Sequence, residues 1–101
     1  RLQAEDEVYN ARHAEARATI QAAEDTAQAE LVVFRNAKDK RGEACMLLSI
    51  AELCYDQGVL KRRAALEACR KACTLYKEVT DTKMLATALL TLSNVHLRAG
   101  L

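Results

Sequence analysis

Hydrophobic and small residues recur every three or four positions along almost the whole chain, which is the spacing of one face of an α-helix. No Gly or Pro interrupts residues 1–37, so the pattern predicts one long helix over about 3–37. The alternative is a helical hairpin that turns near 13–17, but Ala16 at the turn favours helix over a left-handed conformation. The stripe in this segment consists of Ala16, Ile20, Ala23, Ala27, Leu31 and Phe34.

Three further helices are expected, separated by short breaks. The first break is the segment 36–42, NAKDKRG, in which Asp39 is a predicted N-cap. Gly58 is a predicted C′ glycine that ends the next helix, and Thr80 and Asp81 are predicted to cap the last one. The expected helices cover about 40–57, 59–79 and 83–99.

The composition supports an all-α protein, because strong helix formers dominate, Pro is absent and there are only three Gly. No apolar run approaches the length of about 18 residues that a membrane-spanning helix needs, so no membrane partner is expected. The predicted inner faces are Leu47, Ile50, Ala51 and Cys54, with Leu48 and Tyr55 beside them; then Leu66, Cys69, Ala72, Cys73 and Tyr76; then Leu85, Ala88, Leu89, Leu92, Val95 and His96.

The chain repeats itself at an offset of 42 residues. The segment 44–58, ACMLLSIAELCYDQG, returns in altered form as 86–100, ATALLTLSNVHLRAG. The same offset relates Asp39 to Asp81 and Phe34 to Tyr76. A fixed internal period is typical of stacked-repeat folds.

The repeat resembles the tetratricopeptide repeat (TPR), a unit of two antiparallel helices with small residues at set positions. Counting Ala44 as the first position, Leu47 stands at the fourth and small Ala51 at the eighth, and Ala65 and Ala72 keep the spacing of the second helix. The 42-residue unit is longer than usual, like the TPR variants of scaffold and motor-adaptor proteins, and the terminal Pro is missing. The resemblance covers 39–101 and is weak over 1–38.

The resemblance implies antiparallel helical hairpins of a short TPR-like α-solenoid, preceded by a long N-terminal helix. A unit of this kind cannot bury its apolar face alone, so we expect that more protein follows or that copies associate. The start, without Met or an apolar leader, leads us to expect the interior of a longer protein. The expected divisions are 1–38, a long helix or degenerate first repeat; 39–81, one repeat; and 82–101, the first helix of a further, truncated repeat.

Charge is unevenly spread but weak. Residues 1–30 hold seven acids against three Arg, about −4, and residues 31–101 hold twelve bases against seven acids, about +5. A basic cluster comprises Lys61, Arg62, Arg63, Arg70 and Lys71, and no aromatic residue is interleaved with it. A nucleic-acid partner is therefore not expected.

The four cysteines are expected to fill small buried positions, as free Cys commonly does. Cys69 and Cys73 lie four apart on one helix, but no C-x-x-C occurs, and neither His13 nor His96 has a second ligand at metal spacing. We therefore predict no metal, no cofactor and no catalytic residue, hence no enzyme. Unpaired thiols favour a reducing compartment, the cytoplasm.

In TPR proteins the first helix of each unit lines a concave groove. The resemblance therefore implies a mixed apolar and polar groove that suits an amphipathic helix or an extended segment. Asn94 stands where chaperone-binding members use Asn to hold a terminal carboxylate, but the Lys and Arg of that clamp are not at the matching places. The candidate groove residues are Leu48, Ser49, Glu52, Tyr55, Asp56, Leu90, Thr91, Asn94, Leu97 and Arg98, with Cys45 and Thr87 beside them.

The sequence thus predicts a non-catalytic segment for protein–protein interaction or scaffolding, with a protein or peptide partner and possible self-association. One alternative is a structural bundle or dimerisation element whose seam is the heptad Leu2, Tyr9, Ala16 and Ala23. Another is a non-catalytic helical segment within a multidomain enzyme. A turn near Ala16 favours the repeat array, whereas a straight helix favours a bundle or linker.

Overall fold

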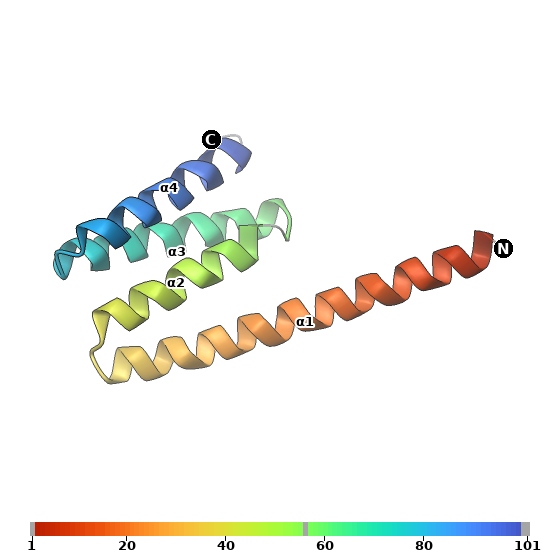
Figure 1. Cartoon of the computed structure of the whole chain (residues 1–101), viewed down its shortest axis with the longest axis horizontal. Coiled ribbons are helices and arrows are strands. Elements are labelled where there is room, and N and C mark those ends of the chain that lie inside the picture. The colour runs from red at the N-terminus through yellow and green to blue at the C-terminus, as the bar shows by residue number, and fades with distance from the viewer. Residues whose placement is uncertain (1, 56, 100–101) are drawn as a thin grey trace.

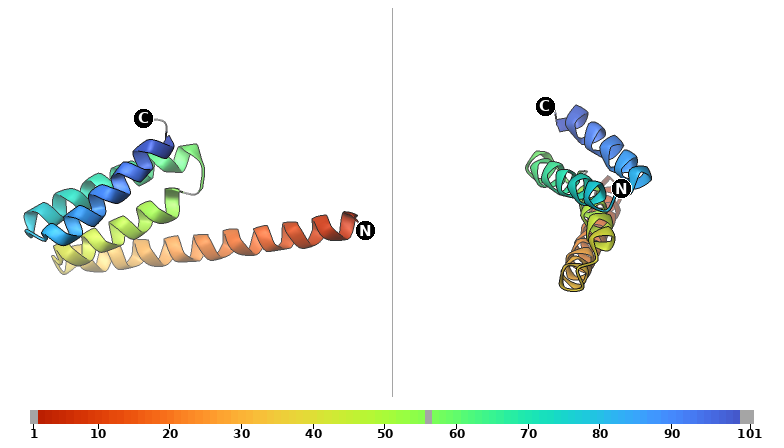
Figure 2. Two further views of the ribbon diagram at one scale, coloured as in Figure 1. Left: turned by 45° about the horizontal axis from the view of Figure 1, so that its top comes forward. Right: turned by 90° about the vertical axis from the view of Figure 1, so that its left-hand side faces the viewer.

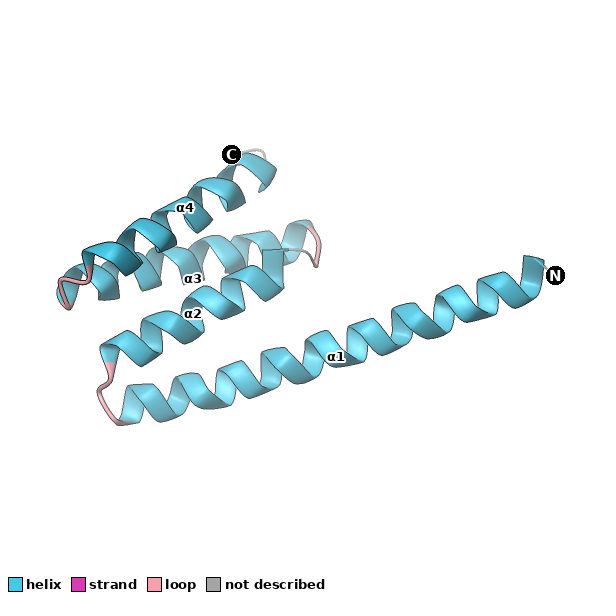
Figure 3. Cartoon of the chain, in the orientation of Figure 1, coloured by secondary structure: helices cyan, strands magenta, loops and turns pink. Residues whose placement is uncertain are grey.

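The structure, a computed structural model, describes residues 2–55 and 57–99, with side chains at 4–55 and 57–97. These residues form four helices joined by short turns (Figure 1; Figure 3). No strand occurs in the described residues, so the prediction of an all-α protein is confirmed. The helices are α1 (Leu2–Asn36), α2 (Lys40–Tyr55), α3 (Val59–Glu78) and α4 (Thr82–Ala99).

The helices form an open series rather than a closed bundle. Each packs against the next helix of the chain, and α2 also touches α4, while α1 makes no close backbone approach to α3 or α4 among the described residues. In the end-on view of Figure 2, the four helices do not surround a common central axis. Because the chain reverses at every turn, α2 and α4 run in the same direction on one side of α3 (Figure 1).

The core lies along α2 and α3, and the predicted inner faces of these two helices are confirmed. Ala44 and Ala51 on α2 and Ala65 and Ala72 on α3 are each 0% exposed. Side chains this small let two helix backbones approach closely. The large buried side chains around them are Leu47, Leu48, Ile50, Leu66 and Tyr76.

The turns after α1 and α3 have the same hydrogen bonds at the 42-residue offset. Lys38 and Thr80 both have positive φ, 57° and 54°. The amide of Asp39 donates to the Phe34 carbonyl at 2.9 Å, and that of Asp81 to the Tyr76 carbonyl at 3.0 Å. Both turns are therefore Schellman motifs, in which a left-handed residue ends the helix.

Asp39 and Asp81 also begin the helices that follow. Asp39 Oδ1 accepts from the Gly42 amide at 3.0 Å, and Asp81 Oδ1 accepts from the Met84 amide at 3.1 Å. Both predicted aspartate N-caps are thus present. Thr80, predicted to share the cap, does not, because its hydroxyl donates to the Val79 carbonyl at 2.7 Å.

Gly58 differs from the prediction. It has φ 112° and ψ 176° and is the N-cap of α3, whose Arg62 amide donates to its carbonyl at 3.1 Å. Helix α2 ends earlier, at Tyr55. The glycine is needed for its conformation, which residues with a Cβ rarely adopt, but it begins α3 instead of ending α2 as a left-handed C′ residue.

Helix α1 is a single straight helix of 35 residues, so the long-helix alternative is the one the structure contains. At about 1.5 Å per residue it is twice as long as α2, and its N-terminal half projects beyond the other helices (Figure 1). Tyr9, on the proposed heptad, is 62% exposed, and its ring lies 4.2 Å from that of His13.

The sequence explains why this half does not fold back as a repeat would. At the 42-residue offset, the positions of buried Leu47, Leu48 and Cys54 are taken by Glu5, Asp6 and Arg12. A charge buried without a partner is strongly unfavourable. The segment therefore lacks the apolar face that α2 uses, and it continues as solvated helix.

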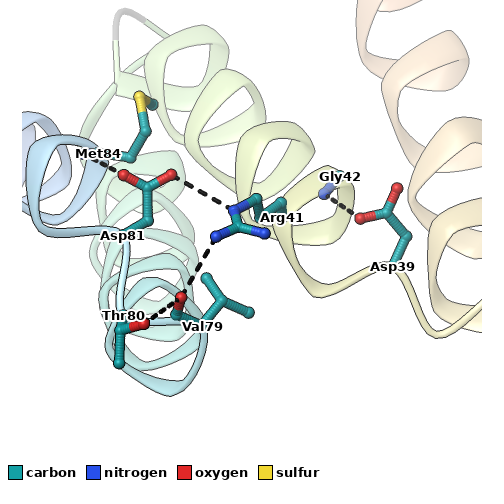
Figure 4. A network of polar contacts seen from close by, with 7 residues as sticks. All are labelled: Asp39, Arg41, Gly42, Val79, Thr80, Asp81 and Met84. Carbon is teal, nitrogen blue, oxygen red and sulfur yellow. Dashed lines mark hydrogen bonds and ion pairs between the residues drawn. The ribbon is translucent and has the colours of Figure 1, made fainter.

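Polar contacts tie the start of α2 to the turn between α3 and α4 (Figure 4). Arg41 Nε lies 3.6 Å from Asp81 Oδ2, and an Arg41 terminal nitrogen donates to the Val79 carbonyl at 3.4 Å. Lys40 pairs with Glu78 at 3.1 Å. These side chains are exposed enough that each pair contributes at most about 1 kcal/mol, and together they connect the start of α2 to the end of α3 and the turn after it.

Gly42 is required by packing and not by its backbone. A Cβ at this position would lie 2.3 Å from Cδ1 of Phe34 on α1. Gly42 therefore lets α1 and α2 meet closely just after their turn, with the Phe34 ring covering the glycine.

We expect Gly42→Ala to lower the free energy of unfolding by about 1–3 kcal/mol, because the methyl group overpacks this contact. In a Phe34→Ala background the same change is expected to be stabilising by up to about 1 kcal/mol, through helix propensity. Urea unfolding followed by circular dichroism measures both. A stabilising Gly42→Ala in the unmodified chain would contradict the described contact.

Thr80→Gly is expected to raise the free energy of unfolding by about 1 kcal/mol, because a β-branched residue is strained at positive φ. For a chain of this size that corresponds to a rise of about 4–8 °C in Tm. Thr74→Gly, an exposed change in the middle of α3, is the matched control and should lower Tm. Equal shifts of the same sign for both variants would argue against a strained turn.

Candidate partner-binding cleft

A cleft of about 260 Å³ lies between α2 and α4. Glu52 and Tyr55 of α2 form one wall, and Thr91 and Asn94 of α4 form the other, with Val95 between them. The two walls come from segments about 40 residues apart that α3 holds side by side. Four of the predicted groove residues therefore meet in space.

The cleft is apolar at its base and polar at its rim. Val95 is 2% exposed, whereas Glu52 and Asn94 are exposed. The Thr91 hydroxyl donates to the Thr87 carbonyl of its own helix at 3.2 Å, which leaves its lone pairs to accept. An Asn amide, a carboxylate and a hydroxyl around an apolar base can hold a side chain and bond the backbone beside it.

The other predicted groove residues lie elsewhere. Leu48 is buried in the core at 6% exposure and does not line the cleft. Ser49 lines the hollow between α1 and α2, and its hydroxyl donates to the Cys45 carbonyl of its own helix at 3.0 Å. Leu90 and Leu97 are 67% and 79% exposed and do not line the cleft. Asp56 and the Arg98 side chain lie outside the described residues.

Val95 is the cleft residue that the groove prediction missed. It was assigned only to the inner face of the last helix, which its burial confirms, and a floor residue of a cleft carries the same apolar signal as a core residue. Leu89, assigned to the same inner face, is 44% exposed. The reason is that α4 packs only on α3 and the edge of α2, so only part of its apolar surface is covered.

Three of the four cysteines are buried, as expected, but Cys45 is exposed. Burial, then the nearby Cys73 and Glu52, raises the pKa of the Cys69 thiol from 9.0 to about 11. Burial likewise raises the pKa of Cys54 and Cys73. These three thiols are therefore neutral packing groups at physiological pH, because the thiolate is the reactive form.

Within the described residues, no group of three or more His, Cys, Asp or Glu side chains is placed to hold a metal ion. In the same part of the chain, no helix combines the length and the apolar character needed to span a membrane.

The basic residue Lys61 lies 3.2 Å from Glu24 of α1, so one member of the basic cluster links α3 to α1.

Comparison of the chain with protein families, curated proteins and solved structures found no match.

Thiol labelling at neutral pH should show one fast cysteine, Cys45, and three slow ones that react only as the chain unfolds. A chromogenic disulfide reagent under pseudo-first-order conditions measures the phases, and Cys45→Ser should remove the fast phase alone. More than one fast equivalent in the native protein would contradict the burial of Cys54, Cys69 and Cys73.

Stability is expected to fall in alkaline solution. The folded state holds the Cys69 proton up to a pKa of about 11, whereas an unfolded thiol releases it near its ordinary pKa. The stability that this neutral thiol provides is fully present below about pH 9 and is lost as pH rises towards 11. Urea midpoints over this range should fall less steeply for Cys69→Ala than for the unmodified chain; equal slopes would count against the assignment.

Proposed function

We propose that this chain is a non-catalytic segment for protein–protein interaction or scaffolding, built from TPR-like helical hairpins. The observation that carries the proposal is the α2–α4 cleft, in which Glu52, Tyr55, Thr91 and Asn94 converge on an apolar base. The partner is a protein or peptide segment that inserts one apolar side chain and offers donors to the rim. Its side chain would contact Val95 and its backbone the polar rim.

The open series of helices supports a repeat-type scaffold. The turns at Lys38–Asp39 and Thr80–Asp81, which precede α2 and α4, have the same hydrogen bonds and the same left-handed residue. Equivalent first helices on one side of an array are how repeat proteins build extended binding surfaces. The buried, neutral thiols of Cys54, Cys69 and Cys73 suit a reducing compartment such as the cytoplasm.

A second candidate function is favoured by the straight α1. Its N-terminal half projects from the other helices, and Val8 and Tyr9 are 52% and 62% exposed there. A helix of this kind can act as a linker or as the seam of a larger helical assembly. This second function concerns residues 2–16, where Glu5, Asp6 and Arg12 replace the core residues of a repeat. It is compatible with an interaction surface formed by α2–α4.

The proposed cleft is tested by selecting peptides from a random library against the immobilised chain, kept in reductant. Thr91→Arg places a long charged side chain in the cleft and should weaken the selected peptides about tenfold or more, since the apolar base is then blocked. Thr74→Arg, the same change at an exposed position of α3, is the matched control and should leave binding unchanged.

Chemical-shift mapping with a selected peptide gives an independent readout. The largest perturbations should fall on Glu52, Tyr55, Thr91 and Asn94. Peptides that bind the Thr91→Arg variant as well as the unmodified chain, or that perturb another surface, would exclude this cleft as the binding site.

A further inference from the structure

A second and larger groove lies between α1 and α2, with a volume of about 710 Å³. Ala23, Thr26 and Ala27 of α1 line one side, and Met46, Glu52 and Leu53 of α2 line the other. Its surface is mostly apolar. No described residue fills it, and its volume exceeds that of the α2–α4 cleft.

The 42-residue offset identifies what this groove is shaped to receive. Shifted by 42, the rim residue Glu52 becomes Asn94, which is exposed, whereas Ala23, Thr26 and Ala27 become Ala65, Ala68 and Cys69 of α3, and Met46 and Leu53 become the buried residues Ala88 and Val95 of α4. Except for Asn94, those residues are buried at 0–7% exposure, and α2 packs against both α3 and α4 there. The α1–α2 groove therefore corresponds to the surface of α3 and α4 on which α2 packs, but no described helix lies in it.

The outer face of α4 carries the matching surface. At the 42-residue offset, several of its residues correspond to residues of α2 that are buried against α3 and α4. Leu90 is 67% exposed, whereas its counterpart Leu48 is 6% exposed. Leu89 is 44% exposed, against 5% for Leu47. The remaining pairs are Ala44 with Ala86, Ala51 with Ser93, and Cys54 with His96; Ala86 and Ser93 are exposed and His96 is half-buried.

The chain's own N-terminal segment cannot fill the groove. A hairpin at Ala16 would bring Glu5 and Asp6 to the places where α2 puts Leu47 and Leu48, beside Glu30 and Glu52 on the groove rim. Charges of one sign would then be brought together and buried.

The charges of α4 suit the acidic rim of the groove, unlike those of the N-terminal segment. Residues 82–99 contain Lys83 and Arg98 and no acid. Lys83, which corresponds to Arg41, would reach Asp39, which corresponds to Asp81 of the 3.6 Å pair.

We propose that copies of this chain associate head to tail, with the outer face of α4 of one copy docked in the α1–α2 groove of the next. The groove shares only Glu52 with the α2–α4 cleft, and the inference does not rest on the function proposed for that cleft. Because the two interacting surfaces differ, the contact is heterologous and each added copy leaves one groove and one α4 face open.

Sedimentation velocity in reductant, from low micromolar to several hundred micromolar chain, tests the association. The average mass should rise with concentration without stopping at a dimer. Leu90→Glu on α4 and Thr26→Glu in the groove each change an exposed residue, so the fold is retained, and each should weaken association by on the order of 100-fold. Leu60→Glu, at a residue that is 90% exposed on α3, is the matched control and should associate like the unmodified chain.

Mixing the two variants separates this contact from other modes. The Leu90→Glu chain keeps an intact groove and the Thr26→Glu chain keeps an intact α4, so an equimolar mixture should form a heterodimer and grow no further. A symmetric α4–α4 contact predicts no such rescue.

Three results would overturn the proposal: an unmodified chain that stays monomeric throughout, a mixture that does not form the heterodimer, or equal loss of association in Leu60→Glu. Peptide binding to the α2–α4 cleft is measured separately and is expected to survive Leu90→Glu and Thr26→Glu. The failure of head-to-tail association can therefore be told apart from the failure of peptide binding in the cleft.

Discussion

The close approach of α3 to its two neighbours is the contact on which the rest of the structure depends. Ala44, Ala51, Ala65 and Ala72 are completely enclosed, and none has a side chain longer than a methyl group. Larger residues at these places would separate α2 from α3 and would move α4, which touches both. The α2–α4 cleft exists only because α3 holds two parallel helices at a fixed separation, so the candidate site is a consequence of this packing.

Much of the helical architecture could be predicted from the sequence, because it is determined locally. Asp39 and Asp81 precede runs of helix formers, and their side chains cap the helices that follow, as their residue type indicates. The faces of α2 and α3 were predictable because both helices are covered on two sides, and apolar periodicity then translates into burial. Asp39 and Asp81 also show that the internal repeat extends to the turns.

The predictions failed where the outcome depends on what an element packs against. Leu89 has the same pattern as Leu47 and was expected on an inner face, but it is 44% exposed because α4 packs only on α3 and the edge of α2 among the described residues. Gly58 was assigned by residue type to the end of one helix, whereas the three-dimensional path of the link uses it to begin the next. The cleft was predicted only in part, because the distance between α2 and α4 is set by α3 and has no local signal.

The turns also determine how this fold extends in space. Only Ala37, Lys38 and Asp39 separate α1 from α2, and Asp39 ends one helix through its amide and begins the next through its carboxylate. A connector with so little freedom holds its two helices in a fixed relative orientation, and the turn at Asp81 has the same hydrogen bonds. The direction of each hairpin is thereby set by three residues, so a single inserted residue there would redirect every later helix while leaving each helix intact.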